Sequence, residues 1–289
     1  MGQNSPSVVS SRSRINYPYA TIRITKSRID KGLIAIPTAL AEWFPDHNET
    51  IEVYLNDSPV SQTKRYSSYA SSTHECRIGG VREWFKQNDI QSGDEIVIQL
   101  INKEHFIYRL IPERNFLLTT QELQRSFDES ETEKAASGTI TTLAEWTQLE
   151  IGNVVLGEYY RLVNTLPFGE RHYVRKRSSR ARESVPANLR TLLEGIYMGH
   201  CQVCDFSFLK RDKNPYFETH HLDAEKGHHP NNVIVVCGNC HNQFEHANVQ
   251  QEFSDEQWLT RVSFNERVYP VRQAVLSTNV EGFFKQLFI

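Results

Sequence analysis

Two pairs of cysteines constrain this chain more than any other feature. Cys201 and Cys204 form the first pair, Cys237 and Cys240 form the second, and 32 residues separate the pairs. Two residues between cysteines let both thiolates face one ion, and four such thiolates complete the closed tetrahedral site of structural zinc. A disulfide within either pair is the alternative, but two matched pairs favour Zn²⁺. Because protein fills all four positions, we expect this ion to stabilise the fold and not to catalyse.

The sequence shows neither a secretory signal nor a membrane-spanning segment, which favours a protein of a reducing compartment. The polar start has no apolar core of a secretory signal, and no apolar run reaches the roughly 18 to 20 residues of a membrane span. We therefore expect a cytoplasmic protein without a membrane partner. The fifth cysteine, Cys76, has no cysteine nearby, and we expect a small, partly buried thiol without a function.

The net charge of -3 conceals a strong asymmetry along the 289 residues, a length that suggests two domains. Basic residues dominate the start, and residues 1–18 are expected to form a flexible basic arm. Residues 113–186 are expected to be an acidic linker and helical connector that ends in the basic stretch 171–182, RHYVRKRSSRAR. Within it, 126–138 is expected to be an exposed connection and 139–165 a helix interrupted at Gly152 and Gly157.

The segment 19–112 reads as short strands separated by turns. Two stretches within it resemble each other, AEWFPDHNETIEVYL from Ala41 and REWFKQNDIQSGDEIVIQL from Arg82, the second having a longer turn. Each has a Glu-Trp-Phe helix end, a polar turn and an alternating strand. A duplicated helix–turn–strand unit predicts a small barrel with internal pseudosymmetry.

This arrangement resembles the DNA-binding pseudobarrel of plant transcription factors and of some restriction endonucleases. The resemblance implies that two loops enter the major groove of double-stranded DNA, the first within 26–31 and the second within 62–77. Arginine can bind a guanine edge, and lysine and tyrosine can hold phosphates. Ordinary exposed loops are the alternative. The expected DNA-binding residues are Lys26, Arg28, Lys31, Lys64, Arg65, Tyr66 and Arg77, joined by Arg175, Lys176 and Arg177 of the basic stretch.

The residues between and after the cysteine pairs indicate the chemistry. A strand is predicted to end in His220 and His221, a second strand to begin at Asn232, and a helix over 238–249 to carry His241. This order resembles the HNH, or ββα-metal, nucleases, and NPYFETHH with CGNCH is most similar to the Mcr-type modification-dependent restriction endonucleases. The alternative is a structural zinc fold whose histidines are inert.

The resemblance implies a role for each of these residues. His221 would be the general base, His220 and His241 would bind a catalytic Mg²⁺ or Mn²⁺, and Asn232 would orient the base and tie the loop between the strands. Adjacent residues of a strand point to opposite faces, so His220 and His221 are expected to have different roles. Which of the two is the base and which the metal ligand could be exchanged. Glu245 is favoured as the third metal ligand, with His246 as its substitute. His228 and His229 are expected to be exposed loop histidines.

These inferences predict an α+β protein with an N-terminal mainly-β pseudobarrel, a helical connector and a C-terminal zinc-containing ββα-metal domain over 187–289. Helices are expected at 187–197, 255–262 and 279–289. We expect a metal-dependent endonuclease of double-stranded DNA, a sequence-specific or methylation-dependent restriction enzyme that works as a homodimer. The sequence contains no glycine-rich phosphate-binding loop, so we do not expect a nucleotide cofactor. The alternatives are a DNA-binding regulator with structural zinc and an RNA-directed or phage-packaging HNH nickase.

Overall fold

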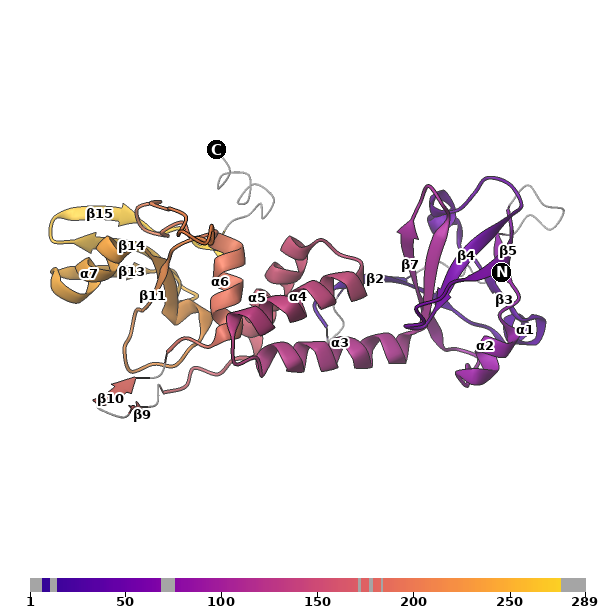
Figure 1. Ribbon diagram of the computed structural model, residues 1–289, viewed down its shortest axis with the longest axis horizontal. Coiled ribbons are helices and arrows are strands. Elements are labelled where there is room, and N and C mark those ends of the chain that lie inside the picture. The colour runs from indigo at the N-terminus through magenta and orange to yellow at the C-terminus, as the bar shows by residue number, and fades with distance from the viewer. Residues whose placement is uncertain are drawn as a thin grey trace. The chain divides into compact units, whose positions relative to one another are not determined.

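The computed structural model describes residues 7–10, 15–68, 76–170, 173–176, 179–182 and 184–276. The chain divides into two compact units, and each is described by itself (Figure 1). The first unit comprises 1–124 with 143–149, and the second comprises 125–142 with 150–289.

One eight-stranded sheet builds the first unit, in the order β1-β2-β7-β8-β4-β5-β6-β3. All neighbours are antiparallel except the parallel pair β4 and β8. The strands are β1 (Ser7–Ser10), β2 (Pro18–Arg23), β3 (Leu33–Ala35), β4 (Glu49–Leu55), β5 (Gln62–Ser67), β6 (Arg77–Gly79), β7 (Glu95–Asn102) and β8 (Ile107–Pro112).

The sheet curls around a single hydrophobic core. Ile22 of β2 and Ile34 of β3 lie near opposite ends of the strand order, yet both belong to one buried cluster with Val53, Ile78 and Ile98. A flat sheet would keep such strands apart, so the shared core requires a barrel-like curvature. This confirms the mainly-β first half expected from the alternating apolar residues.

Both copies of the duplicated segment form a helix, a turn and a strand. The first copy supplies the 3₁₀ helix η1 (Thr38–Trp43) before β4, and the second supplies α2 (Arg82–Gln87) before β7. Phe44 and Phe85, the matching aromatic residues, are both buried in the core. Phe44 stacks on Tyr108 with ring centroids 4.4 Å apart, so the aromatic end of each copy anchors its helix to the barrel.

Within the flexible arm expected over 1–18, residues 7–10 form a strand and residues 15 and 17 are buried. Strand β1 pairs with β2 in continuous register, Ser7 facing Thr21 and Ser10 facing Pro18. Ile15 and Tyr17 are each 1% exposed. Burial of these two apolar side chains fixes the segment before β2, and that part of the arm prediction was wrong.

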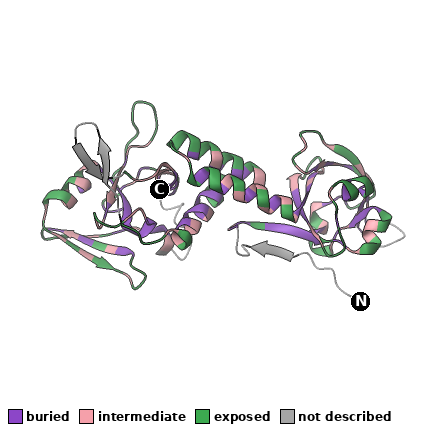
Figure 2. Ribbon diagram, turned by 90° about the horizontal axis from the view of Figure 1, so that it is seen from below, coloured by how far each residue is buried: buried purple, intermediate pink, exposed green. Residues whose placement is uncertain are grey.

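The acidic stretch 126–138 is mostly exposed, as expected, but it consists of the ends of two helices and the short connection between them. Helix α3 (Glu113–Asp128) runs into 126–138, and α4 (Glu133–Thr147) begins inside it. Phe116 and Phe127 of α3 are fully buried, and their spacing places them on one helical face. Helix α5 (Ile151–Thr165) contains Gly152 and Gly157 without interruption. Figure 2 shows buried and exposed residues alternating along these helices.

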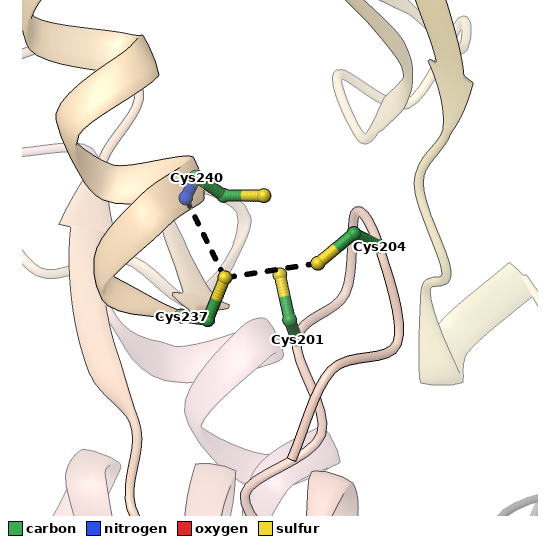
Figure 3. A group of neighbouring side chains, drawn as sticks. All are labelled: Cys201, Cys204, Cys237 and Cys240. Carbon is green, nitrogen blue, oxygen red and sulfur yellow. Dashed lines mark hydrogen bonds between the residues drawn. The ribbon is translucent and has the colours of Figure 1, made fainter.

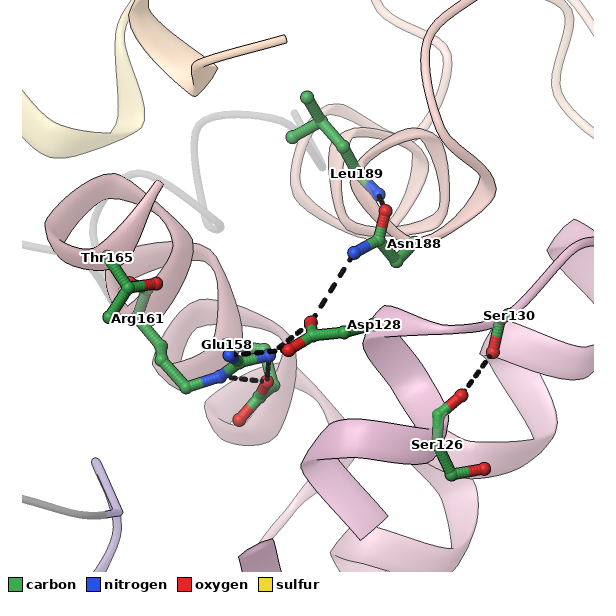
Figure 4. A network of polar contacts seen from close by, with 8 residues as sticks. All are labelled: Ser126, Asp128, Ser130, Glu158, Arg161, Thr165, Asn188 and Leu189. Atoms are coloured by element: carbon green, nitrogen blue, oxygen red, sulfur yellow. Dashed lines mark hydrogen bonds and ion pairs between the residues drawn. The ribbon is translucent and has the colours of Figure 1, made fainter. Parts of the chain in front are cut away.

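A partly buried group of three charged residues joins helices of the second unit (Figure 4). Arg161 donates two hydrogen bonds to Asp128, at 2.9 and 2.6 Å, and another to Glu158 at 2.7 Å. Glu158 is completely buried. Asn188 of α6 (Ala187–Tyr197) reaches Asp128 at 3.5 Å. Asp128, within the supposed linker, is therefore a structural residue that connects α3, α5 and α6.

The second unit ends in two small sheets and a helix. Strands β11 (Glu218–His221) and β12 (Val233–Val236) pair antiparallel and are followed by α7 (Gly238–His246). A three-stranded sheet of β13 (Val249–Phe253), β14 (Leu259–Phe264) and β15 (Arg267–Pro270) follows. Helix α6 has the predicted bounds, whereas α7 is shorter than predicted because Val249 begins β13.

The helix predicted over 255–262 is wrong, because most of that apolar pattern belongs to β14. A bulge in the pairing places Phe253 opposite Leu259 and Glu252 opposite Arg261, so Thr260 is the extra residue. As a result, Leu259 and Val262 both face the core although they are three residues apart. That spacing imitates a helical face.

Strands β9 (Tyr173–Lys176) and β10 (Ser179–Arg182) form a hairpin in the basic stretch. The helix predicted over 279–289, with the dimer contact that it could provide, lies outside the described residues. Among the described residues, none of the helices combines the length and the apolar character that a bilayer crossing requires.

Candidate metal centres and nucleic-acid surface

The four paired cysteines converge at the base of α7. Their Sγ atoms all lie within 4.8 Å of one another, and Figure 3 shows the side chains facing a common centre. Cys237 is the N-terminal capping residue of α7 and accepts from the Cys240 amide at 3.5 Å. The other pair is held by a tight turn in which the Asp205 amide donates to the Cys201 carbonyl.

This donor set fits a zinc ion. The Sγ atoms of Cys204 and Cys237 are 3.7 Å apart, close to the separation of about 3.8 Å that a tetrahedron with Zn–S bonds of about 2.3 Å requires. All four thiols are free. The hydrogen bond between Cys201 and Cys240 lowers the pKa of Cys201 and raises that of Cys240. The cluster can therefore hold a metal ion, and the alternative of a disulfide within a pair is not formed.

A second candidate metal-binding group consists of His220, His241 and Glu245, whose ligand atoms also lie within 4.8 Å of one another. His220 comes from β11, and the other two occupy successive turns of α7, one above the other on the same face. Glu245 Oε1 is 3.8 Å from His220 Nδ1 and 4.0 Å from His241 Nε2. Two imidazoles and a carboxylate suit a divalent cation, and His246 is not in this group.

Glu218 fixes the orientation of His241. Its carboxylate is hydrogen-bonded to His241 Nδ1, and it accepts a second hydrogen bond from the Tyr216 hydroxyl. The hydrogen bond from Tyr216, which has the larger effect, and the hydrogen bond with His241 both lower the pKa of Glu218. A carboxylate on Nδ1 leaves Nε2 facing Glu245, which is the usual arrangement behind a metal-binding histidine. Sequence reasoning missed Glu218, although it lies two residues before His220.

His221 faces different partners from its neighbour. His220 stacks on Phe244 with ring centroids 4.4 Å apart, whereas His221 Nε2 lies 3.0 Å from His228 Nδ1. His221 is 8% exposed and is not in the metal-binding group. The alternation of side chains along β11 thus separates the two adjacent histidines.

The loop between β11 and β12 is held by Asn232. The side-chain amide donates to the carbonyls of Asp223, Lys226 and Gly227, at 3.1, 3.3 and 3.0 Å. Its oxygen accepts from the Asp223 amide at 2.8 Å. Asn232 therefore fixes the loop that carries His228, and His228 makes the hydrogen bond to His221.

The two loop histidines differ from the expectation of exposed side chains. His228 is half-buried against His221. His229 is 5% exposed, stacks on Phe168 at 4.1 Å, and has Nε2 3.1 Å from the Val163 carbonyl. Both rings pack against other side chains, which the polar sequence of the loop does not indicate.

In the first unit, exposed basic side chains come from neighbouring elements. Residues 26–31 form the short helix α1 (Lys26–Lys31) rather than a loop, and Lys26 and Lys31 are exposed. This helix leads into β3, which pairs with β6, and β6 pairs with β5. Arg65 on β5 is exposed, while Arg28 and Arg77 are half-buried.

Two of the expected DNA-binding residues are engaged elsewhere. Tyr66 is 1% exposed and its hydroxyl donates to Cys76 Sγ at 3.1 Å. It is a core residue, because strand alternation turns it inward when Arg65 points outward. Lys64 donates to the Gly80 carbonyl at 2.8 Å. Cys76 is 2% exposed, more deeply buried than expected.

Some expected DNA contacts cannot be placed. Residues 69–75 of the second loop and Arg177 lie outside the described residues. Arg175 and Lys176 belong to β9, but their side chains are not described.

No known protein-family model and no curated protein sequence matches this chain. Solved structures are similar over part of it, among them the following three. An Arabidopsis FUS3–DNA complex shows 13% identity, covering 32% of this chain and 92% of that chain with a TM-score of 0.27. The Arabidopsis thaliana transcription factor LEC2–DNA complex shows 17% identity over 32% and 88%, with a TM-score of 0.27. The N-terminal domain of Helicobacter pylori LlaJI.R1 shows 15% identity over 34% and 86%, with a TM-score of 0.26.

Proposed function

We propose that this chain is a metal-dependent endonuclease that hydrolyses phosphodiester bonds of double-stranded DNA. The observation that carries the proposal is the separation of two adjacent histidines, His220 toward the group with His241 and Glu245, and His221 toward His228. Metal-dependent hydrolysis of a phosphodiester uses a metal site and a general base, and β11 would supply one residue to each.

The residues suit these tasks chemically. A divalent cation held by His220, His241 and Glu245 would neutralise phosphate charge and stabilise the leaving oxygen. His221 takes the proton from the attacking water, for which an imidazole with a reference pKa near 6.5 is suited. Glu218 holds the ring of His241, and Asn232 with His228 holds the environment of His221.

DNA recognition is assigned to the first unit. Exposed Lys26, Lys31 and Arg65 come from elements around one end of the strand order. Their chemistry fits phosphate and guanine contacts. A barrel that binds DNA, joined to a metal-dependent nuclease unit, is the organisation of a restriction enzyme, with two copies needed to cut both strands.

A plasmid assay tests the function. We expect the purified chain to cleave plasmid DNA with Mg²⁺ or Mn²⁺ and to stop when EDTA is added. His241→Ala should need far more metal, whereas the exposed His105→Ala should cleave like the wild type. Binding without scission under any divalent metal would instead show a DNA-binding regulator. Matched methylated and unmethylated plasmids would determine whether modification controls cutting.

A further inference from the structure

A surface hairpin follows the first cysteine pair and is not used by the proposed chemistry. We call residues 206–215 the knuckle hairpin. Every residue from 204 to 214 is exposed, including large apolar side chains. Phe206 is 54% exposed, Phe208 46% and Leu209 66%. A cluster of exposed apolar side chains on a protein surface often marks a site of interaction with a partner.

The exposure is not the result of a loose backbone. The Tyr216 amide donates to the Phe208 carbonyl at 3.0 Å, and the Lys210 amide donates to the Asn214 carbonyl at 2.8 Å. Leu209 and Pro215 form an antiparallel bridge. At its base, the Cys201 amide donates to the Phe206 carbonyl at 3.0 Å. The hairpin therefore presents its apolar side chains in a fixed position.

The knuckle hairpin adjoins the second metal-binding group. The rings of Phe206 and Phe208 are 5.9 Å apart, and Phe208 stacks on Tyr216 at 4.7 Å. The Tyr216 hydroxyl donates to Glu218, which is hydrogen-bonded to His241. A continuous series of side-chain contacts thus leads from the exposed aromatic rings to a proposed catalytic ligand.

The charge of the hairpin selects one kind of partner. Its turn carries Lys210, Arg211 and Lys213 against Asp212, which pairs with Lys210 at 3.9 Å. Exposed cations beside exposed aromatic rings match a polyanion with flat apolar bases. A symmetric contact with a second copy would bring these cations together, because the same patch meets itself.

We propose that the knuckle hairpin binds the DNA next to the phosphodiester that is cut. Arg211 and Lys213 contact phosphates, while Phe206 and Leu209 pack against sugars and base edges. The inference rests on the proposed function, since it concerns DNA at the same site. It adds a contact that positions the strand over the metal-binding group.

Binding measurements on the full chain test the inference. Affinity for a DNA duplex would be measured across salt concentrations in a His221→Ala background, so that the DNA stays intact. Arg211→Ala with Lys213→Ala should reduce the slope of log affinity against log salt by about 2, since each phosphate contact contributes about 0.9. Phe206→Ser with Leu209→Ser should weaken binding about tenfold at an unchanged slope. The matched control is Arg267→Ala with Val268→Ser in β15, where Val268 is 63% exposed.

The same pairs of substitutions in the otherwise wild-type chain separate the possible results. Lower kcat/KM for cleavage together with the altered binding would support the contact. Cleavage and binding both equal to the wild type would overturn the hairpin contact and leave the nuclease proposal standing. If the wild-type chain never cuts DNA but the hairpin variants bind DNA more weakly than the wild type, the nuclease proposal would be overturned and the DNA contact of the hairpin would stand. Weakened self-association with unchanged DNA binding would overturn the inference, because the surface would then bind another copy. Zinc content and melting temperature should remain those of the wild type, since the substituted side chains are exposed.

Discussion

At the scale of single residues, the hydrogen bond between His221 and His228 gives the proposed base a fixed orientation. Asn232 holds the carbonyl of Gly227, the residue before His228, and the Gly227 amide donates to the Gly169 carbonyl at 2.6 Å. Both backbone polar groups of Gly227 are thus hydrogen-bonded, which fixes the backbone directly before His228. The effect of His228 on cleavage would pass through His221.

Replacing His228 tests this positioning role. His228→Leu removes the hydrogen-bonding atom, and we expect kcat to fall about ten- to a hundredfold, because misplaced catalytic groups lose that much. His228→Asn retains a polar atom near the position of Nδ1 and should recover part of the loss. KM for DNA should not change. Equal impairment in both variants would indicate a merely structural residue.

Glu218 offers a second test at this scale. The Tyr216 hydroxyl and then His241 lower its pKa, so the carboxylate remains ionised below the usual range. The contribution of ionised Glu218 to the stability of the fold is therefore fully present above the pKa that this carboxyl has in the unfolded chain. It is lost only as the pH falls through the lower pKa of the folded state. Protonation of Glu218 should therefore not reduce activity between pH 7 and about 5.

The corresponding variant is Glu218→Gln. We expect the metal concentration for half-maximal cleavage to rise about 10- to 100-fold, as for other residues behind metal-binding histidines, with a smaller change at saturating metal. The exposed Glu256→Gln is the matched control. An unchanged metal requirement would remove Glu218 from the site.

At the scale of elements, the cysteine cluster ties the segment before β11 to the N-terminus of α7. Cys201 and Cys240 lie in the same buried cluster as Val236 and Leu259. A metal ion bound there contributes directly to folding free energy.

Metal analysis should find one zinc ion per chain. Cys201→Ser should lose the zinc and lower the melting temperature of the second unit, whereas Cys76→Ser should keep it, because Cys76 lies in the barrel core. A Cys201→Ser chain with full zinc content would contradict the site.

The ion pair among α3, α5 and α6 gives a separate prediction of stability. Glu158→Ala leaves Arg161 largely buried with one partner fewer, and we expect a loss of about 3 kcal/mol in the free energy of unfolding. Glu83→Ala breaks the exposed pair with Lys86 and should cost less than about 1 kcal/mol. Denaturant unfolding of both variants would measure the difference, and equal losses would contradict it.

Elements with one strong local signal were predictable from the sequence. The alternating strands of the barrel and helix α6 follow from their apolar spacing, and the cysteine pairs converge as expected. Strand β14 was mistaken because its bulge imitates helical spacing. Helix α3 was missed because its acidic residues outnumber the buried Phe116 and Phe127.

At the scale of the whole molecule, the proposed function assigns DNA recognition to the first unit and cutting to the second. Tertiary packing, which no local pattern shows, brought His228 to His221. The sequence order of His220, His221, Asn232 and His241 nevertheless indicated the candidate site. What it could not show is which neighbours hold each histidine.

The central claim is that His221 acts as the base in metal-dependent cleavage of DNA. The most direct measurement is the single-turnover rate of duplex cleavage by His221→Ala and by the wild type, at saturating Mn²⁺, with binding of the same duplex measured in parallel. We expect the rate of His221→Ala to be about 10²- to 10⁴-fold lower than that of the wild type, with unchanged affinity. Equal rates for the two proteins would contradict it.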